Sequence, residues 1–176
     1  MINSLSILIP TYNNVCLELV KSLQAQAAAL PDFEYEILVA DDGSTDRLTI
    51  YENREIRSLP YCRYIEREKN VGRAAIRNFL AEKALHPWLL FIDSNMQVIH
   101  PQYLTTYLQS EESDVIYGGY QIKRNDEKYQ HNLRYIFECI GTQNADYKQR
   151  QANPYGDFHT SNFMVKIGRA SCRERV

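Results

Sequence analysis

The sequence lacks the features that would mark several classes of protein. No apolar run approaches the roughly 20 residues that a transmembrane helix needs. The N-terminus has neither the basic segment nor the cleavage site of a signal peptide, and collagen, coiled-coil and repeat patterns are absent. Lys and Arg number 20 and Asp and Glu 22. The resulting net charge of −2 argues against a nucleic-acid binder, because such proteins need a basic surface.

Cysteine pairs are also missing. The four cysteines, Cys16, Cys62, Cys139 and Cys172, stand far apart, and none lies in a CxxC pair or has a histidine at the spacing of a zinc site. We therefore expect buried or incidental thiols in a reducing compartment, and a cytoplasmic protein.

Short apolar segments alternate with amphipathic ones along the chain. The 176 residues suit one domain or a large part of one, and 44% of them are hydrophobic. The expected strands are residues 4–9, 35–40, 62–66, 88–92 and 114–122. The expected helices are residues 17–30, 47–56, 73–80, 101–108 and 133–140. This alternation predicts an α/β fold with a mainly parallel central sheet flanked by helices.

Polar clusters follow three of the expected strands. They are residues 10–13 (Pro-Thr-Tyr-Asn), 41–44 (Asp-Asp-Gly-Ser) and 93–95 (Asp-Ser-Asn). Ligands of open α/β sheets bind beyond the carboxyl ends of the strands, so neighbouring parallel strands would bring these clusters to one edge.

Each cluster has a functional and a plain reading. Asp41 and Asp42 can accept hydrogen bonds from a base or a sugar, or they form an ordinary Asp-Gly turn. Residues 93–95 offer two oxygen-bearing side chains for Mg²⁺ or Mn²⁺, or they form a solvated turn. Gly72 leaves N–H groups open at a helix start, where Arg73 and Arg77 can meet phosphate, or the helix carries two ordinary surface arginines.

The order of these motifs resembles the family 2 glycosyltransferases, which have the GT-A fold. The resemblance is carried by residues 10–13, 41–46, 70–72 with Asn78, and 91–95. It is close over residues 4–100 and looser over 114–165. It implies an inverting enzyme that moves a sugar from a nucleotide-diphosphate donor, with a UDP-sugar expected, to a saccharide or other hydroxyl acceptor.

The resemblance also implies roles for single residues. Thr11 and Tyr12 would contact the base and ribose, and Asp41 or Asp42 would read a uracil-type base, with the choice between them open. The start of the helix after residue 70 would border the nucleotide. The Asp-x-Asp position would touch the ribose with its first residue and hold Mn²⁺ or Mg²⁺ with its last. Asn70, Gly72 and Arg73 occupy the start of that helix. Asp93 and Asn95 occupy the first and last places of the Asp-x-Asp position, and Asp93 is also expected to be catalytic and a metal ligand.

Two positions depart from the family pattern. Asn95 brings no charge, which puts metal dependence in doubt. The general base, usually an Asp in a Glu-Asp-like motif well past the Gly-Gly strand, is not found, and Asp157 and His159 are weaker candidates. We therefore expect a truncated, inactive form of a longer enzyme, with a domain over residues 1–166. Residues 167–176 are expected to be a vector-derived tail, and residues 142–162 a lid or an incomplete region.

Two other functions stay open. One is a non-catalytic nucleotide-sugar-binding module. The other is a Rossmann-type enzyme using NAD, which fits less well because no Gly-rich turn follows the first strand. Related enzymes often work at the cytoplasmic face of a membrane, so peripheral membrane association is a further expectation, and nucleic acid is not an expected partner.

Overall fold

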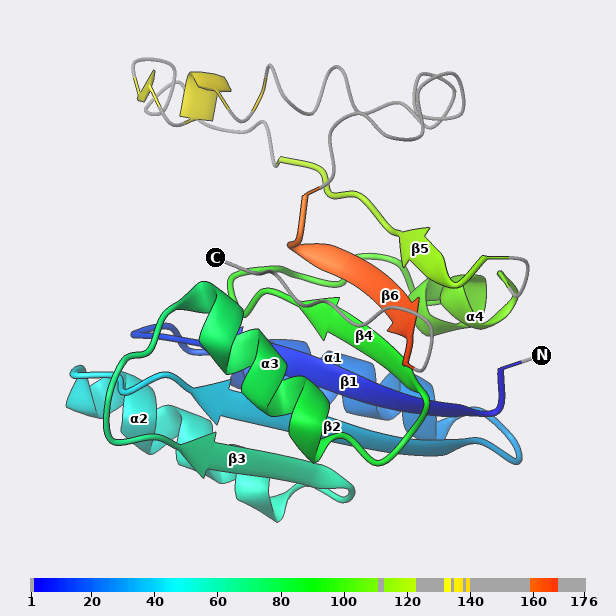
Figure 1. The fold of residues 1–176 in the computed structure, drawn as a ribbon, viewed down its shortest axis with the longest axis horizontal. Coiled ribbons are helices and arrows are strands. Elements are labelled where there is room, and N and C mark those ends of the chain that lie inside the picture. Colours follow the sequence, from blue (N-terminus) through cyan, green and yellow to red (C-terminus); the bar gives the residue numbers. More distant parts are fainter. Residues whose placement is uncertain are drawn as a thin grey trace.

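The computed structural model describes residues 2–110, 113–122, 132–133, 135–137, 139 and 159–167. In these residues six strands form one sheet in the order β3-β2-β1-β4-β6-β5 (Figure 1). The strands are β1 (Ser4–Thr11), β2 (Glu34–Asp41), β3 (Cys62–Glu66), β4 (Trp88–Ile92), β5 (Val115–Tyr117) and β6 (Asn162–Lys166). Strands β1 to β4 run parallel, whereas β6 is antiparallel to both β4 and β5. The predicted α/β fold with a mainly parallel sheet is confirmed.

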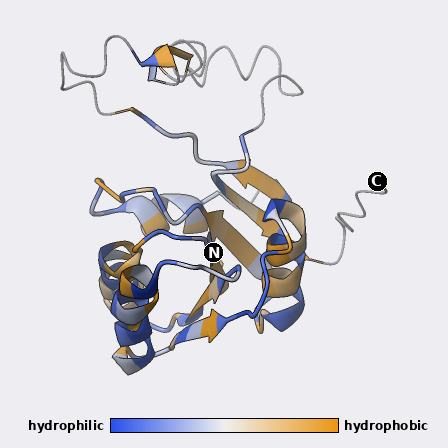
Figure 2. Ribbon diagram, turned by 90° about the vertical axis from the view of Figure 1, so that its left-hand side faces the viewer, coloured by the Kyte–Doolittle hydropathy of each residue, from blue (hydrophilic) through white to orange (hydrophobic). Residues whose placement is uncertain are grey.

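Helices cover both faces of this sheet. They are α1 (Leu17–Ala28), α2 (Arg47–Asn53) with the 3₁₀ helix η1 (Arg54–Ser58), α3 (Arg73–Lys83) and α4 (Tyr103–Leu108). Figure 1 shows α3 in front of the sheet and α1 behind it. Alternate side chains of β1 therefore enter different cores, with Ile7 on the α1 side and Leu8 against Ile76 and Leu80 of α3. The strands are the hydrophobic middle layer of the view in Figure 2, as expected of a sheet buried on both faces.

Helix α2 differs from the amphipathic helix that the sequence predicts. Leu48 and Tyr51 are 71% and 70% exposed, and of the expected apolar face only Ile56 is buried. Of the residues that could cap this helix, Ser44, Thr45 and Asp46, it is Asp46 whose side chain accepts the N–H of Leu48, at 3.1 Å. The inward positions of α2 itself hold the polar Thr49, which donates to the cap residue Asp46 at 2.6 Å, and Asn53, which bonds the loop after β1.

The β5–β6 pair is the main correction to the expected topology. The strand expected over residues 114–122 is only β5, and the segment expected to be irregular up to residue 162 ends in a strand, β6. Strand β6 pairs with β4, which lies far away in the sequence, so no local sequence pattern predicts this pairing. Of the expected helix 133–140, residues 133, 135–137 and 139 are helical. Residues 142–158 and the expected tail from 168 onward lie outside the described residues.

The described cysteines form no pairs. Cys16 and Cys62 are buried free thiols and Cys139 is half-buried, whereas Cys172 is outside the described residues. Burial and the nearby Asp41 raise the pKa of Cys16 to about 12, and burial raises the pKa of Cys62 to about 11. Both thiols therefore stay protonated and unreactive at neutral pH. None of the helices described here combines the length and apolar character needed to cross a bilayer.

Candidate functional site

The carboxyl ends of the four parallel strands lie at one edge of the sheet. The register pairs Thr11 of β1 with Asp41 of β2, and Asp41 with Glu66 of β3. Strand β4 runs beside β1 in the same direction and ends just before Asp93. The three polar clusters that follow β1, β2 and β4 therefore share this edge, as parallel pairing requires.

The loop after β1 is fastened to the loop after β2 through Asn13. The Asn13 Oδ1 accepts the N–H groups of Thr45 at 2.8 Å and Asp46 at 3.0 Å, and its Nδ2 lies 3.2 Å from Thr45 Oγ1. Its own N–H donates to Ser44 Oγ at 2.8 Å. Asn13 has a φ of +47°, a conformation that Asn tolerates better than most residues. Asn13 thus fixes the relative positions of two predicted binding loops.

A second asparagine, Asn53, binds the loop after β1 through hydrogen bonds to its main chain. Asn53 is fully buried at the end of α2, where its Oδ1 accepts the N–H of Cys16 at 2.9 Å. Its Nδ2 donates to the carbonyl of Asn14 at 2.9 Å. The Thr11 hydroxyl, also buried, donates to that carbonyl at 2.8 Å. Tyr12, 47% exposed, is among the side chains of this loop that face solvent, together with Asn13 and Val15.

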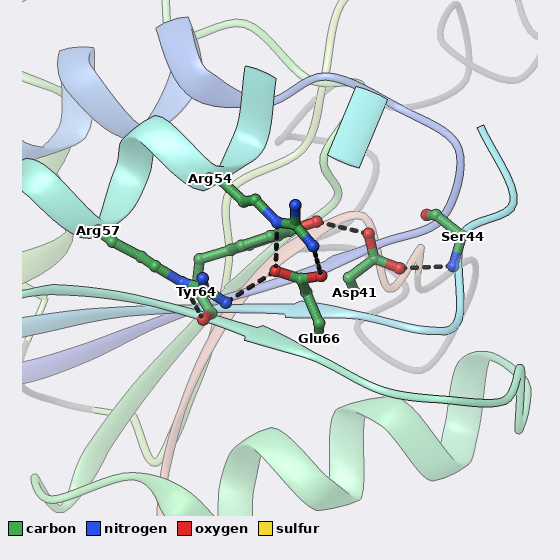
Figure 3. Close-up of polar contacts among 6 residues, drawn as sticks. All are labelled: Asp41, Ser44, Arg54, Arg57, Tyr64 and Glu66. Carbon is green, nitrogen blue, oxygen red and sulfur yellow. Dashed lines mark hydrogen bonds and ion pairs between the residues drawn. The ribbon is translucent and has the colours of Figure 1, made fainter. Parts of the chain in front are cut away.

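Asp41 and Asp42 point to opposite faces of the sheet, since successive residues of a strand alternate. Asp41 lies on the α1 side, where its Oδ2 accepts the Tyr64 hydroxyl at 2.6 Å and its Oδ1 the N–H of Ser44 at 2.7 Å (Figure 3). Burial, and then the Asp41 carboxylate, raise the pKa of the Tyr64 phenol, so this hydroxyl remains a donor. Asp41 is therefore the buried support of the loop after β2.

Asp42 fastens the same loop to the start of α3. Its Oδ1 accepts the N–H of Val71 at 3.0 Å and its Oδ2 the N–H of Gly72 at 2.9 Å. The two connections touch so closely that a Cβ on Gly43 would lie 2.6 Å from the nitrogen of Asn70. Gly43 and Gly72 have φ values of +73° and +90°, which favour glycine. Asn70 is exposed beside them, and its Oδ1 also accepts the N–H of Gly72.

A charged brace supports the end of β3 beside Asp41. Glu66 receives two hydrogen bonds from Arg54, at 2.9 and 2.8 Å, and one from Arg57 at 2.7 Å (Figure 3). The bonds from Arg54 are the largest cause holding the pKa of Glu66 below its usual value, and Arg57 adds to the effect. The brace ties η1 and the end of α2 to the edge of the sheet that carries the candidate site.

Asp93 lies between two arginines of α3. Arg73 donates to Asp93 Oδ2 at 3.0 Å, and Arg77 pairs with Asp93 Oδ1. The Arg73 side chain is 76% exposed and that of Arg77 only 12%. Burial lowers the pKa of Arg77 and Asp93 opposes this shift, but a guanidinium keeps its charge at any ordinary pH. Asn95, two residues beyond Asp93, is exposed.

The chemistry of these groups does not match a divalent-ion site. In the described part of the chain, no three His, Cys, Asp or Glu side chains gather where they could hold a metal ion. Asp93 has both oxygens engaged by cations, and Asn95 can offer only one neutral oxygen. Residues 93–95 thus lie where the sequence predicts them, but their contacts do not fit Mg²⁺ or Mn²⁺.

A second polar centre lies where β6 meets α4. The buried Asn162 accepts the hydroxyls of Tyr103 at 2.5 Å and Tyr107 at 2.7 Å, and it donates to the carbonyl of Gly119 at 2.8 Å. Burial is the largest cause raising the pKa of both tyrosines. A Cβ on Gly118 would lie 1.9 Å from the Tyr107 hydroxyl, which explains the glycine there. A cavity of about 440 Å³ lies beside α4, lined in part by these tyrosines and Gly118.

All the residues predicted for the site lie at one edge of the sheet, at the ends of β1 and β2, on the connections after β1, β2, β3 and β4, or at the start of α3. They are Thr11, Tyr12, Asp41, Asp42, Asn70, Gly72, Arg73, Asp93 and Asn95. Their roles toward a ligand stay predictions. Of the residues that join them, Asn13 belongs to the predicted cluster 10–13 but its joining role is not predicted, and Asn53 carries no signal in the sequence that separates it from other asparagines. Arg77 has such a signal, because it follows Arg73 by four residues on one helix. Of the two weaker base candidates, His159 stacks edge-on against Tyr120, and Asp157 lies outside the described residues.

This fold defines an α/β domain of the GT-A type. Residues 6–170 match glycosyl transferase family 2, so the chain belongs to that family. Validoxylamine A glucosyltransferase of Streptomyces hygroscopicus subsp. jinggangensis is 38% identical over 111 residues, which are 59% of this chain and 24% of that protein. The chain thus spans about a quarter of the length of this curated relative.

Solved structures show the same fold. S. aureus TarS in complex with UDP-GlcNAc is 26% identical, with a TM-score of 0.52 over 76% of this chain and 42% of that one. Glucosyl-3-phosphoglycerate synthase of Mycobacterium tuberculosis, in complex with Mn²⁺, UDP and glucosyl-3-phosphoglycerate, has a TM-score of 0.56. The match covers 93% of this chain and 57% of that one at 18% identity, a level at which the likeness is one of fold alone.

Proposed function

We propose that this domain binds the donor of a sugar-transfer reaction, a nucleotide-diphosphate sugar with uridine as the expected base. The observation that carries the proposal is the linking of four connections into one edge. Asn13 joins the first to the second, Asp42 joins the second to the start of α3, and Arg77 of α3 reaches Asp93. Family membership supports this proposal, and the UDP-GlcNAc bound by TarS supports the choice of a uridine nucleotide.

The predicted residues divide into those that face solvent and those that shape the loops. Tyr12 and Asn70 are exposed and can meet the base and ribose. Asp41 and Asp42 are buried, and each accepts two hydrogen bonds. A carboxylate has about four lone-pair directions, so each keeps acceptor capacity for the imide N–H of a uracil-type base. Because the two residues are only 2% and 4% exposed, the loop would have to open for the base to reach them. Thr11 and Gly72 act through the backbone geometry of their loops.

The proposed reaction is a single displacement with inversion. The acceptor hydroxyl oxygen forms a bond to the anomeric carbon while the bond from that carbon to the diphosphate oxygen breaks. A general base takes the hydroxyl proton, and positive groups at the end of β4 stabilise the charge that develops on the leaving diphosphate. His159 is the described candidate for the base, and Asp157 is the other. Since neither lies in the motif usual for the family, we expect this chain to bind donor without robust transfer.

The metal predicted at Asp93 and Asn95 has no part in this scheme. Before a divalent ion could bind Asp93, Arg73 and Arg77 would have to move away from its carboxylate or share it with the ion. A cytoplasmic location and peripheral membrane association stay predictions from the sequence.

A non-catalytic module that binds nucleotide sugars is the second candidate function. The neutral Asn95 favours it. The two candidates share the donor site and differ only in turnover, so sugar transfer to an acceptor would separate them.

Thermal denaturation with a panel of nucleotides tests the proposal. We expect uridine diphosphate and UDP-sugars to raise the melting temperature, because a ligand that binds only the folded state stabilises it. Adenosine diphosphate and NAD are the matched controls and should leave it unchanged. A shift with NAD and none with uridine diphosphate would contradict the proposed donor and favour the Rossmann alternative.

A further inference from the structure

The end of β4 carries more positive than negative charge. Asp93 supplies one negative charge, and Arg73 and Arg77, which both contact it, supply two positive charges. Asn95, the next oxygen-bearing ligand candidate, is neutral. A divalent cation at this point would meet two guanidinium groups and one already paired carboxylate, which is an unfavourable electrostatic environment.

Within the described part of the chain, Arg77 has one donor without a partner, but this donor is closed off from solvent. Its Nε is buried and has no hydrogen-bond partner among the described residues, while its terminal nitrogen holds Asp93. A second terminal nitrogen bonds the carbonyl of Arg73 at 3.3 Å. The guanidinium is thus fixed in place, whereas the exposed Arg73 can turn on its stem toward a ligand.

Resting on the function proposed above, we propose that this chain binds its nucleoside diphosphate without a divalent cation. The arginines Arg73 and Arg77 meet the phosphate charge that a metal ion would otherwise neutralise. Guanidinium groups suit this role because their planar donors match phosphate oxygens and their charge is permanent. Asp93 pairs with both arginines and so holds them at the end of β4.

The negative charges nearby do not cancel this arrangement. The Asp42 carboxylate accepts hydrogen bonds from the N–H groups of Val71 and Gly72. The Asp41 carboxylate points to the opposite face of the sheet, toward Tyr64. The connection from β3 to α3 adds Arg67 and Lys69, with Glu68 between them. The groups that face the end of β4 from α3 are therefore the two cations.

Titration calorimetry with uridine diphosphate tests the inference on the 176-residue chain. One arm contains EDTA and the other saturating MnCl₂, and the dissociation constants should agree within about threefold, a difference of about 0.65 kcal/mol. Arg73→Gln should weaken binding by about tenfold in both arms, as expected for the loss of a charge-assisted hydrogen bond. Lys83→Gln removes the same charge from the far end of α3, roughly 15 Å away, and should leave binding unchanged.

The outcomes separate the inference from the function on which it rests. Binding only with Mn²⁺ would overturn the inference and leave the donor site standing. Equal effects of Arg73→Gln and Lys83→Gln would also overturn it, because the charge would then act without regard to position. Absence of binding in both arms, with well-folded protein, would overturn the donor site and the inference together.

Discussion

The carboxylate of Asp42 accepts the main-chain N–H of Gly72 at 2.9 Å, across 30 residues of chain. This bond joins the loop after β2 to the first turn of α3. The helix in turn carries the arginines that hold Asp93 at the end of β4. A contact made by backbone N–H groups on a buried carboxylate is hard to replace, so the edge of the sheet behaves as one connected unit.

Asp42→Asn should weaken this joint. An amide cannot accept both the N–H of Val71 and that of Gly72, so one buried donor loses its partner, at a cost of about 1–3 kcal/mol in the free energy of unfolding. Urea denaturation measures the loss, with Asp32→Asn in an exposed turn as the control. Equal stability of Asp42→Asn and the wild-type protein would show that the two hydrogen bonds do not form in solution.

Asn13→Gly should reduce nucleotide affinity more than stability. Glycine keeps the backbone at a φ of +47° but removes the side-chain bonds to Thr45 and Asp46. We expect uridine diphosphate to bind about five- to tenfold more weakly, since each net hydrogen bond contributes about 1 kcal/mol. Asp32→Gly is the matched control, because Asp32 also has a positive φ, of +51°, away from the site. A similar change in affinity for both variants would argue against Asn13 as a positioning residue.

The Glu66 brace should make stability depend on acidic pH. The folded-state pKa of Glu66 lies below its usual 4.5, so its stabilisation is complete above that pH and is lost as pH falls through the folded pKa. Because Glu66 and its arginines are partly exposed, the effect should be at most about 1 kcal/mol and smaller in high salt. Chemical denaturation from pH 6 to pH 3 should show a smaller acid loss for Glu66→Gln than for wild type. Equal losses of stability for Glu66→Gln and wild type between pH 6 and pH 3 would show that the brace does not contribute to the acid sensitivity.

Asn95→Asp should create a response to metal that the native sequence lacks. The new carboxylate adds a charged oxygen two residues from Asp93, which strengthens any site for a hard cation. We expect Mn²⁺ to bind the variant measurably more tightly by calorimetry, and Asn95→Gln, which stays neutral, to behave as wild type. Equal or weaker Mn²⁺ binding by Asn95→Asp would place residue 95 outside reach of a metal at this edge.

Much of the parallel half of the fold could be predicted from the sequence. Strands β3 and β4 have the bounds expected from their apolar runs, and Asp46 caps α2 as its chemistry suggests. These features are local, because the side chains that define them are consecutive or lie within one helical turn. Parallel pairing then brings the polar strand ends to one edge without further information.

What the sequence left out depends on contacts between distant segments. Strand β6 forms only by pairing with β4 and β5, and Asn162 acquires its role only when Tyr103 and Tyr107 reach it. The burial of Thr49 and Asn53 in place of Leu48 and Tyr51 reflects the loops that α2 supports. Asn13 belongs to a predicted cluster, but its joining role depends on the contacts it makes with the loop after β2. Polar residues with tertiary partners are therefore the ones that local patterns miss.

Amide chemical shifts recorded by NMR during a titration with uridine diphosphate will show whether the four strand ends form one nucleotide site. We expect the amides of Asn13, Ser44 and Gly72 to shift together with one dissociation constant. The amides of Glu34 and Trp88, at the opposite ends of their strands, should stay in place. Shifts confined to the Glu34 and Trp88 end or to the cavity beside α4, or no shifts at saturating nucleotide, would contradict a donor site at this edge.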